Sequence, residues 1–318
     1  MKKLLAVAVA TAISAPAMAD MTIYGTVAVD FIKGDVATSD VSNVERDDVV
    51  FGMKGSSQTD AGLNVSAEVK TEGDFTSPTL AYLKVDNGTV ALWGGKFGSP
   101  ADAADTVDYS NTGNVTYFSG EVDNAVGVTL SSNGFSAGFG AVRNGTTNEG
   151  TVAQLGYAVD GLSINFGMEE TSNTVTTTKA LKVNGVEYAT AAEADAGYAF
   201  DYKATGVKVA YAMDALTVGV AIADAEYTSV ETPANKVDVE TTTIFGSYAM
   251  GNTTLSAFYA QDEAQFAGDP AVEMDTTAFK VAQKLGGGLS AYAEYSINDS
   301  DTEALDGNNV TIGGSFSF

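Results

Sequence analysis

The sequence contains no cysteine and no histidine, and it has few basic residues. It therefore lacks the usual general base of enzymes, a thiol nucleophile and the commonest zinc ligands. There are 16 Lys and Arg residues against 41 Asp and Glu residues, which argues against nucleic acid as a partner. No window approaches about 18 consecutive apolar residues, so membrane-spanning helices are excluded. We expect no enzyme, no metal ion and no cofactor.

The amino terminus has the layout of a secretory signal peptide. Two lysines precede an apolar segment over residues 4–13, and small residues follow it as far as Ala19. We expect cleavage before Asp20, so that residues 1–19 are the signal peptide and residues 20–318 form one mature domain. Removing two lysines leaves 14 basic and 41 acidic residues, a net charge of −27.

Almost the whole mature sequence has apolar residues at every second position. At the carboxyl end, Val310, Ile312, Phe316 and Phe318 share one face of a predicted strand, with polar or small residues between them. A strand that continues to the last residue is expected to be tied into a sheet. Sixteen segments alternate in this way: 22–31, 47–55, 63–72, 80–87, 88–97, 121–130, 134–142, 151–159, 161–170, 206–213, 215–227, 241–250, 252–261, 276–285, 287–297 and 310–318.

Short and long connections alternate between these segments, as in an up-and-down meander. The longer, polar ones fall at about 33–46, 98–120, 143–150, 171–202, 227–238, 262–273 and 299–308, with a hairpin turn expected at Asn184-Gly185. Closing such a sheet removes both of its edges, and its apolar outer face suits lipid rather than water. We therefore predict an all-β fold, a transmembrane antiparallel β-barrel of about 16 strands in which the last segment pairs with the first.

Several motifs resemble those of one protein family. They are the opening TIYGTVAVD, FGMKG in the second segment, DNAVGVTLSSNGFSAGF at 123–139, LGGGLSAYAEY near the end, and the terminal Phe318. In this order they resemble the general diffusion porins of Gram-negative outer membranes over essentially the whole mature chain. The resemblance implies a homotrimer in the outer membrane, surrounded by lipid and lipopolysaccharide, with the third extracellular loop folded into the pore. It also implies that the outer-membrane assembly machinery recognises the last strand through Phe316 and Phe318.

The connection at 98–120 is the predicted third loop. Ser99 is a suitable N-cap and Pro100 suits a first helical position, so we expect a short helix there. Aspartates spaced three apart lie on one side of such a helix. The acidic residues expected at the pore constriction are Asp102, Asp105, Asp108 and Glu121. The alternatives are a solvated acidic surface loop or, less in keeping with the sequence, a glycosidase-like acid pair at Asp105 and Asp108.

The wall opposite this loop departs from the family. The resemblance implies inward arginines at three positions, which here are Val50, Thr79 and Glu121. By alternation, the remaining inward basic residues are Arg46, Lys54 and Lys70. We therefore predict a thin basic wall and a lumen that is net negative. Arg46 and Lys54 have an equally good structural interpretation as ion-pair partners of Asp48 or Glu68.

These observations predict an outer-membrane channel for passive diffusion of small hydrophilic solutes and ions. An acidic lining concentrates cations and repels anions, so we expect a preference for cations. One alternative is a structural or adhesive barrel whose long loops, notably 171–202, bind a partner. Another is a substrate-specific channel, which needs an aromatic track. The inward aromatic residues by alternation are scattered: Tyr24, Phe245, Phe258 and Tyr292.

Overall fold

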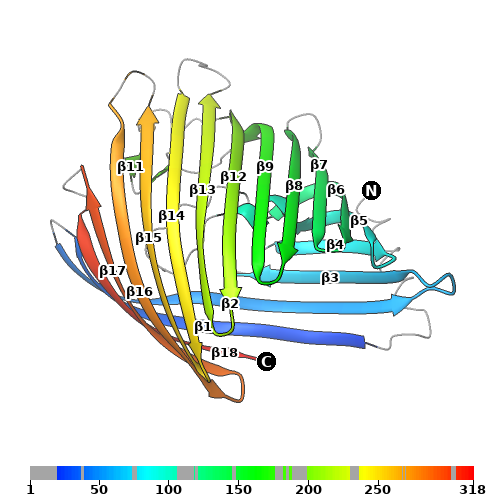
Figure 1. Ribbon diagram of the computed structural model, residues 1–318, viewed down its shortest axis with the longest axis horizontal. Helices are drawn as coiled ribbons and strands as arrows, with labels where there is room; N and C mark the ends of the chain where they lie inside the picture. The colour runs from blue at the N-terminus through cyan, green and yellow to red at the C-terminus, as the bar shows by residue number, and fades with distance from the viewer. Residues whose placement is uncertain are drawn as a thin grey trace.

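Sixteen strands form one closed antiparallel barrel (Figure 1). The computed structural model describes residues 20–36, 39–73, 77–105, 118, 121–144, 148–175, 182–183, 186–187, 199–229, 236–266, 268, 270–301 and 306–318. Each strand of the barrel pairs with the next along the chain, except that β9 is followed by β12. The predicted up-and-down barrel is therefore confirmed. The predicted signal peptide, 1–19, lies outside the described residues.

The strands are longer than the alternating segments of the sequence. Their bounds are β1 Asp20–Val36, β2 Ser39–Gln58, β3 Asn64–Glu72, β4 Pro78–Asp86, β5 Val90–Gly98, β6 Glu121–Ser132, β7 Phe135–Asn144, β8 Asn148–Val159, β9 Leu162–Val175, β12 Ala199–Met213, β13 Leu216–Ser229, β14 Lys236–Met250, β15 Thr253–Phe266, β16 Val272–Gly286, β17 Leu289–Ser300 and β18 Gly307–Ser317. The prediction of a long connection at 33–46 is wrong, because most of these residues continue β1 and β2.

The two faces of the barrel differ as the alternation predicts. On β1, Val29 and Phe31 are 48 % and 45 % exposed, whereas Ala28 and Asp30 between them are 4 % and 2 % exposed. Large exposed apolar residues recur on the same face of the other strands, for example Phe51, Leu92, Val126, Phe139, Leu155, Ile222, Ile244 and Phe279. An apolar exterior of this kind suits lipid, and the opposite face lines a lumen.

The barrel closes between the last strand and the first, as predicted. In Figure 1 the red β18 lies beside the blue β1, and their register runs from Thr26 opposite Ser317 to Val36 opposite Gly307. Phe318 continues the ladder beyond β18, because its amide donates to the Gly25 carbonyl at 3.0 Å and its carbonyl accepts from the Gly25 amide at 3.1 Å. The carboxyl terminus is therefore tied into the sheet to its last residue.

A β-bulge in β2 interrupts the alternation from which Arg46 was predicted to face the lumen. Val27 is opposite Val49, but Val29 is opposite Arg46, so β2 has one additional residue between these pairs. Val29 belongs to the outward face of β1. Residues directly opposite each other in an antiparallel pair share a face. The register therefore pairs position 46 with an outward residue of β1 rather than an inward one, and the side chain of Arg46 lies outside the described residues.

The turns between paired strands follow the predicted pattern of short connections on one side. Asn133 and Gly134, between β6 and β7, both have positive φ, and so do Asp160 and Gly161 between β8 and β9. This is the backbone of tight hairpin turns. A further hairpin, β10 (Lys182–Val183) with β11 (Val186–Glu187), brackets the expected turn at 184–185. No helix within the described ranges is long and apolar enough to cross a bilayer.

Candidate functional site

The connection after β5 begins with a short 3-10 helix, η1 (Pro100–Ala104). Ser99 is its N-cap, and the Ser99 hydroxyl accepts a hydrogen bond from the Ala101 amide at 3.3 Å. Pro100, with its fixed φ, occupies the first helical position. The predicted short helix is confirmed, and it ends before Asp105.

This loop lies against the inner face of the barrel wall. A Cβ added to Gly167 of β9 would be 2.7 Å from the Ala101 carbonyl oxygen, and one added to Gly206 of β12 would be 3.0 Å from Phe118 Cε2. Phe166 and Val207, the sequence neighbours of these glycines, are exposed apolar residues of the outer face. The glycines therefore face the lumen, and the described part of the loop is folded inward. Glycine is required at both positions because any side chain would displace the loop.

Three apolar residues of the loop anchor it to the wall. Ala101 and Ala104 are fully buried, and Phe118 is 4 % exposed. They pack with inward residues of β12 to β15, which are Ala204, Ala223, Ala225, Val237, Val239 and Ala264, with Tyr202 and Tyr227 beside them. We call this set the loop-docking cluster. Most of its members are small, so the loop can approach the wall closely.

Asp105 belongs to the docking face rather than to the open pore. It is 8 % exposed, and its carbonyl oxygen accepts a hydrogen bond from Lys208 Nζ at 2.9 Å. Its carboxylate and that of Glu169, which is 1 % exposed, both interact electrostatically with the phenol of Tyr202. The sequence predicts Asp105 at the constriction, and the structure places it on the inward loop with its side chain buried. Asp102 on η1 is only half-buried.

The remaining predicted site residues of this region fall partly outside the described structure. Asp108 lies outside the described residues, as do the side chains of Glu121, at the start of β6, and Arg46, in β2. Val50 is opposite the inward Thr26, as predicted. Thr79 is instead the additional residue of a bulge in β4, and its hydroxyl donates to the Lys70 carbonyl at 3.3 Å.

The two described lysines of the predicted basic wall face the lumen. Lys54 is directly opposite Glu68, and its Nζ lies 5.5 Å from the centre of the Tyr24 ring. Both carboxylate oxygens of Glu68 accept hydrogen bonds from phenols, one from Tyr24 and one from Tyr82. Lys70 forms an ion pair with Glu72, with 2.5 Å between Nζ and Oε1. The wall is therefore a mixture of cations, carboxylates and phenols.

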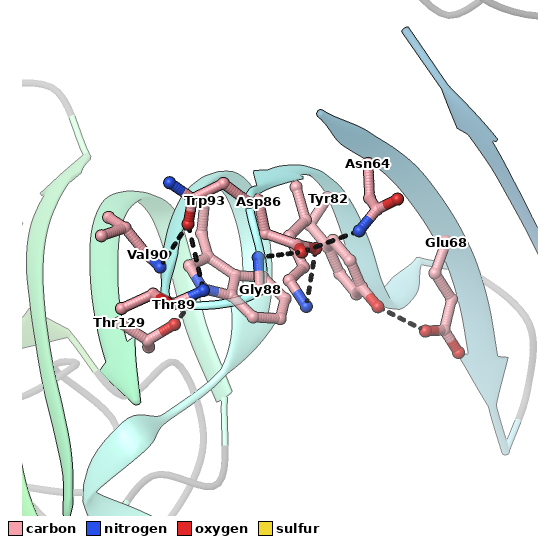
Figure 2. Close-up of polar contacts among 11 residues, drawn as sticks. Asn64, Glu68, Tyr82, Asp86, Gly88, Thr89, Val90, Trp93 and Thr129 are labelled. Atoms are coloured by element: carbon pink, nitrogen blue, oxygen red, sulfur yellow. Dashed lines mark hydrogen bonds and ion pairs between the residues drawn. The ribbon is translucent and has the colours of Figure 1, made fainter. Parts of the chain in front are cut away.

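An aromatic ladder on β4 and β5 was not predicted from the sequence. The rings of Tyr82 and Trp93 have centroids 5.1 Å apart, and those of Trp93 and Phe97 are 5.7 Å apart. Trp93 Nε1 donates to the Thr129 hydroxyl at 3.1 Å (Figure 2). Trp93 is the single tryptophan of the chain. Pairing β4 with β5 across the short turn at 87–89 places the rings of Tyr82 and Trp93 on the same, inner face.

A lysine and an aspartate stand beside this ladder. Lys84 Nζ lies 4.9 Å from the centre of the Trp93 ring and 3.3 Å from Asp86 Oδ2. Asp86 also accepts hydrogen bonds from Asn64 at 3.2 Å and from the Gly88 amide at 3.1 Å (Figure 2). The position of Lys84 over the ring adds a cation–π contact to the ion pair.

A second unpredicted cluster crosses the seam where the barrel closes. The Tyr292 hydroxyl on β17 donates to Asp30 on β1, reaching across β18. Lys280 of β16 lies 4.2 Å from the centre of the Tyr292 ring and 3.5 Å from Glu294 Oε2. Asp30 and Glu294 are almost fully buried. We call these four residues the seam cluster.

The predicted inward aromatic residues lie flat against the wall. A Cβ added to Gly52, Gly219 or Gly313 would fall within 2.4 Å of a ring atom of Tyr24, Phe245 or Tyr292, respectively. Each ring therefore covers a glycine on the neighbouring strand. Phe258 packs with Phe245. These rings form no continuous track with one another, in agreement with their scattered positions in the sequence.

Several lumen carboxylates are held by neutral donors. Besides Glu68, Asp30 accepts from the Tyr292 hydroxyl and Asp262 from the Thr241 hydroxyl. Such hydrogen bonds fix a carboxylate in place without cancelling its charge. The described residues contain no group of three or more His, Cys, Asp or Glu side chains suited to hold a metal ion.

A closed barrel with an apolar exterior, a polar lumen and a loop folded inside it defines a transmembrane channel. The chain belongs to the Gram-negative porin family, whose model matches residues 6–303. It is therefore an outer-membrane channel for small solutes. No curated protein sequence matches the chain significantly.

Solved structures of outer-membrane proteins share the fold. OmpT of Vibrio cholerae, in a trimer form, is 15 % identical with a TM-score of 0.74, covering 94 % of this chain and 99 % of that one. An anion-selective porin from Comamonas acidovorans is 13 % identical with a TM-score of 0.72, covering 94 % and 99 %. OmpF of Salmonella typhi, in a complex with daunomycin, is 14 % identical with a TM-score of 0.67, covering 94 % and 97 %.

Proposed function

We propose that this porin passes small hydrophilic solutes and ions by passive diffusion and prefers cations. The proposal rests on which side chains contact the carboxylates of the lumen. Tyrosine and threonine hydroxyls hold Glu68, Asp30 and Asp262, whereas Lys70 and Lys84 are each matched by a carboxylate of their own. Lys70 and Lys84 are therefore largely neutralised within the wall, which supports a lumen that is net negative.

The overall charge supports the same direction. The mature chain carries 14 basic against 41 acidic residues, so cations approach either mouth of the pore through a negative potential. The similar fold of an anion-selective porin sets no sign for this chain, because selectivity depends on the side chains of the lumen and not on the barrel.

The experiment is a reversal-potential measurement on the purified porin in a planar bilayer with a tenfold KCl gradient. We expect the sign of a cation-selective pore at low salt. The potential should shrink when both sides are raised towards 1 M, where the Debye length falls to roughly 3 Å. A potential of the opposite sign, or none at low salt, contradicts the proposal. Absence of any conductance would favour the adhesive barrel.

A substrate-specific channel is the second candidate, and the aromatic ladder favours it. Tyr82 and Trp93 are half-buried rings that face the lumen beside Lys84. A solute that stacks on them should reduce the ion current in a saturable manner, whereas general diffusion predicts a current that no small sugar or amino acid saturates.

We further infer that the porin is exported by residues 1–19, assembles as a homotrimer within lipid and lipopolysaccharide, and performs no catalysis. A terminal strand with outward Phe316 and Phe318, whose ring centroids are 6.1 Å apart, supports recognition by the outer-membrane assembly machinery. Amino-terminal sequencing of the mature protein should begin at Asp20, and unheated gels should show a trimer that heating dissociates.

A further inference from the structure

Lys208 connects the barrel wall to the inward loop. It lies on β12, two residues after Gly206, and the intervening Val207 faces outward. Its Nζ donates to the Asp105 carbonyl oxygen at 2.9 Å. Lys208 is directly opposite Asn165 of β9 and Ala221 of β13, so it rises from the middle of the wall on which the loop rests.

The carbonyl oxygen that accepts this hydrogen bond belongs to the residue at the end of the short helix, where the direction of the loop is set. Asp105 is the C-cap of η1, and its backbone is already extended, with φ −65° and ψ 159°. At this point the helix has ended. The apolar contacts of Ala101 and Ala104 are close but non-directional, whereas a charge-assisted hydrogen bond fixes both distance and direction.

The same ammonium group also acts on the charge of the loop. Lys208 interacts electrostatically with the carboxylates of Asp105 and Asp102. Its half-buried position reduces screening by water, so its influence on these carboxylates is larger than that of a surface lysine. One cation therefore acts on two carboxylates of the inward loop.

We propose that Lys208 positions the inward loop and limits its negative charge, so that this one residue sets both the steadiness of the open pore and the strength of its selectivity. The selectivity part rests on the proposed cation preference, and the positioning part does not. A pore lacking Lys208 would have a looser loop and a more negative constriction.

The test compares Lys208→Met, which removes charge and donor, with Lys208→Arg, which retains both. Lys203→Met is the matched control, because Lys203 is an exposed lysine on the outward face of the same strand. Each variant is purified as the folded porin, and single-channel noise and the cation-to-anion permeability ratio are measured in KCl. If the Met variant fails to assemble, Lys208→Gln replaces it.

We expect Lys208→Met to raise the permeability ratio by roughly two- to threefold at low salt, since the positive charge that acts on the carboxylates of the inward loop has been removed. It should also increase the noise of the open-channel current. Lys208→Arg and Lys203→Met should behave like the unmodified porin in both measurements. Noise that stays unchanged in Lys208→Met overturns the positioning role, and a ratio that stays unchanged overturns the role in selectivity.

The proposed cation preference and the proposed role of Lys208 can be refuted independently. If the unmodified porin shows no cation preference, the proposed function is wrong, but the difference in noise between the Met and Arg variants still tests the position of the loop. If the unmodified porin prefers cations while all variants behave alike, the function stands and Lys208 has neither role.

Discussion

Replacing Gly167 with valine should move the inward loop away from the wall. The added Cβ would be 2.7 Å from the Ala101 carbonyl oxygen and 3.0 Å from Ala104 Cβ, whereas ordinary contact begins at 3.4 Å. Ordinary contact would therefore require the loop or the strand to shift by about 0.7 Å, and the two further methyl groups of valine would require a larger shift. Overpacking of this kind costs about 1–3 kcal/mol.

The loop should yield and the strand should not. β9 is held on both sides by continuous ladders with β8 and β12, and valine is a favourable residue within a strand. Among the described residues of the loop, Phe118 and two alanines are buried against the wall, and full burial of a phenylalanine side chain contributes about 1.5–3 kcal/mol. The overpacking cost is therefore similar to the docking energy, so the loop is displaced towards the pore axis.

Single-channel conductance measures the effect. We expect Gly167→Val to assemble with normal heat-modifiable mobility but to have a lower and noisier conductance. Gly246→Val is the matched control, because Gly246 lies at an outward position of β14 where the nearest atom to an added Cβ is at 3.5 Å. An assembled Gly167→Val porin with unchanged conductance and noise would refute the docking of the loop on this wall.

Three other substitutions test the seam, the terminus and the loop charge. Tyr292→Phe removes the donor to the buried Asp30 and should destabilise the barrel by about 1–3 kcal/mol, seen as a lower temperature of heat modification on gels; an unchanged temperature would argue against a seam role. Phe318→Asp should sharply reduce folded porin in the outer membrane, and normal yield of the heat-modifiable form would contradict this. Asp102→Asn should weaken cation preference more than Asp105→Asn, because Asp105 is only 8 % exposed whereas Asp102 is half-buried and closer to solvent; equal shifts in reversal potential would contradict that ranking.

Alternation predicted the barrel because the membrane imposes it. Within the apolar belt each strand must present apolar residues to lipid and polar or small residues to the lumen, so the period is visible in a single sequence. Above the belt both faces meet water, and the constraint disappears. The stretch 33–46 has polar residues at both odd and even positions, so its sequence predicts a loop although most of it lies in β1 and β2.

The site was predictable only where local chemistry determines it. Ser99 and Pro100 mark the start of η1 because capping depends on neighbouring residues alone. The burial of Asp105 depends on Lys208, more than one hundred residues away in the sequence, and no local pattern indicates it. The docking glycines did carry a signal, since glycine inside a strand often marks the close approach of another backbone.

The bulge opposite Ala28 shows how one inserted residue changes a functional prediction. Counting by twos from Val50 places Arg46 in the lumen, but the additional residue of β2 reverses the face of every position above it. The side chain of Arg46 lies outside the described residues, and the described basic residues of this wall are lysines. Among them, Lys70 and Lys84 have carboxylate partners on the same wall, and Lys54 lies over a phenol. A wall of such internally matched pairs produces only a weak transverse field, because opposite charges a few ångströms apart largely cancel at the distance of the pore axis. Selectivity then depends on the balance between the acidic inward loop, which carries Asp102 and Asp105, and the cation Lys208 beside it.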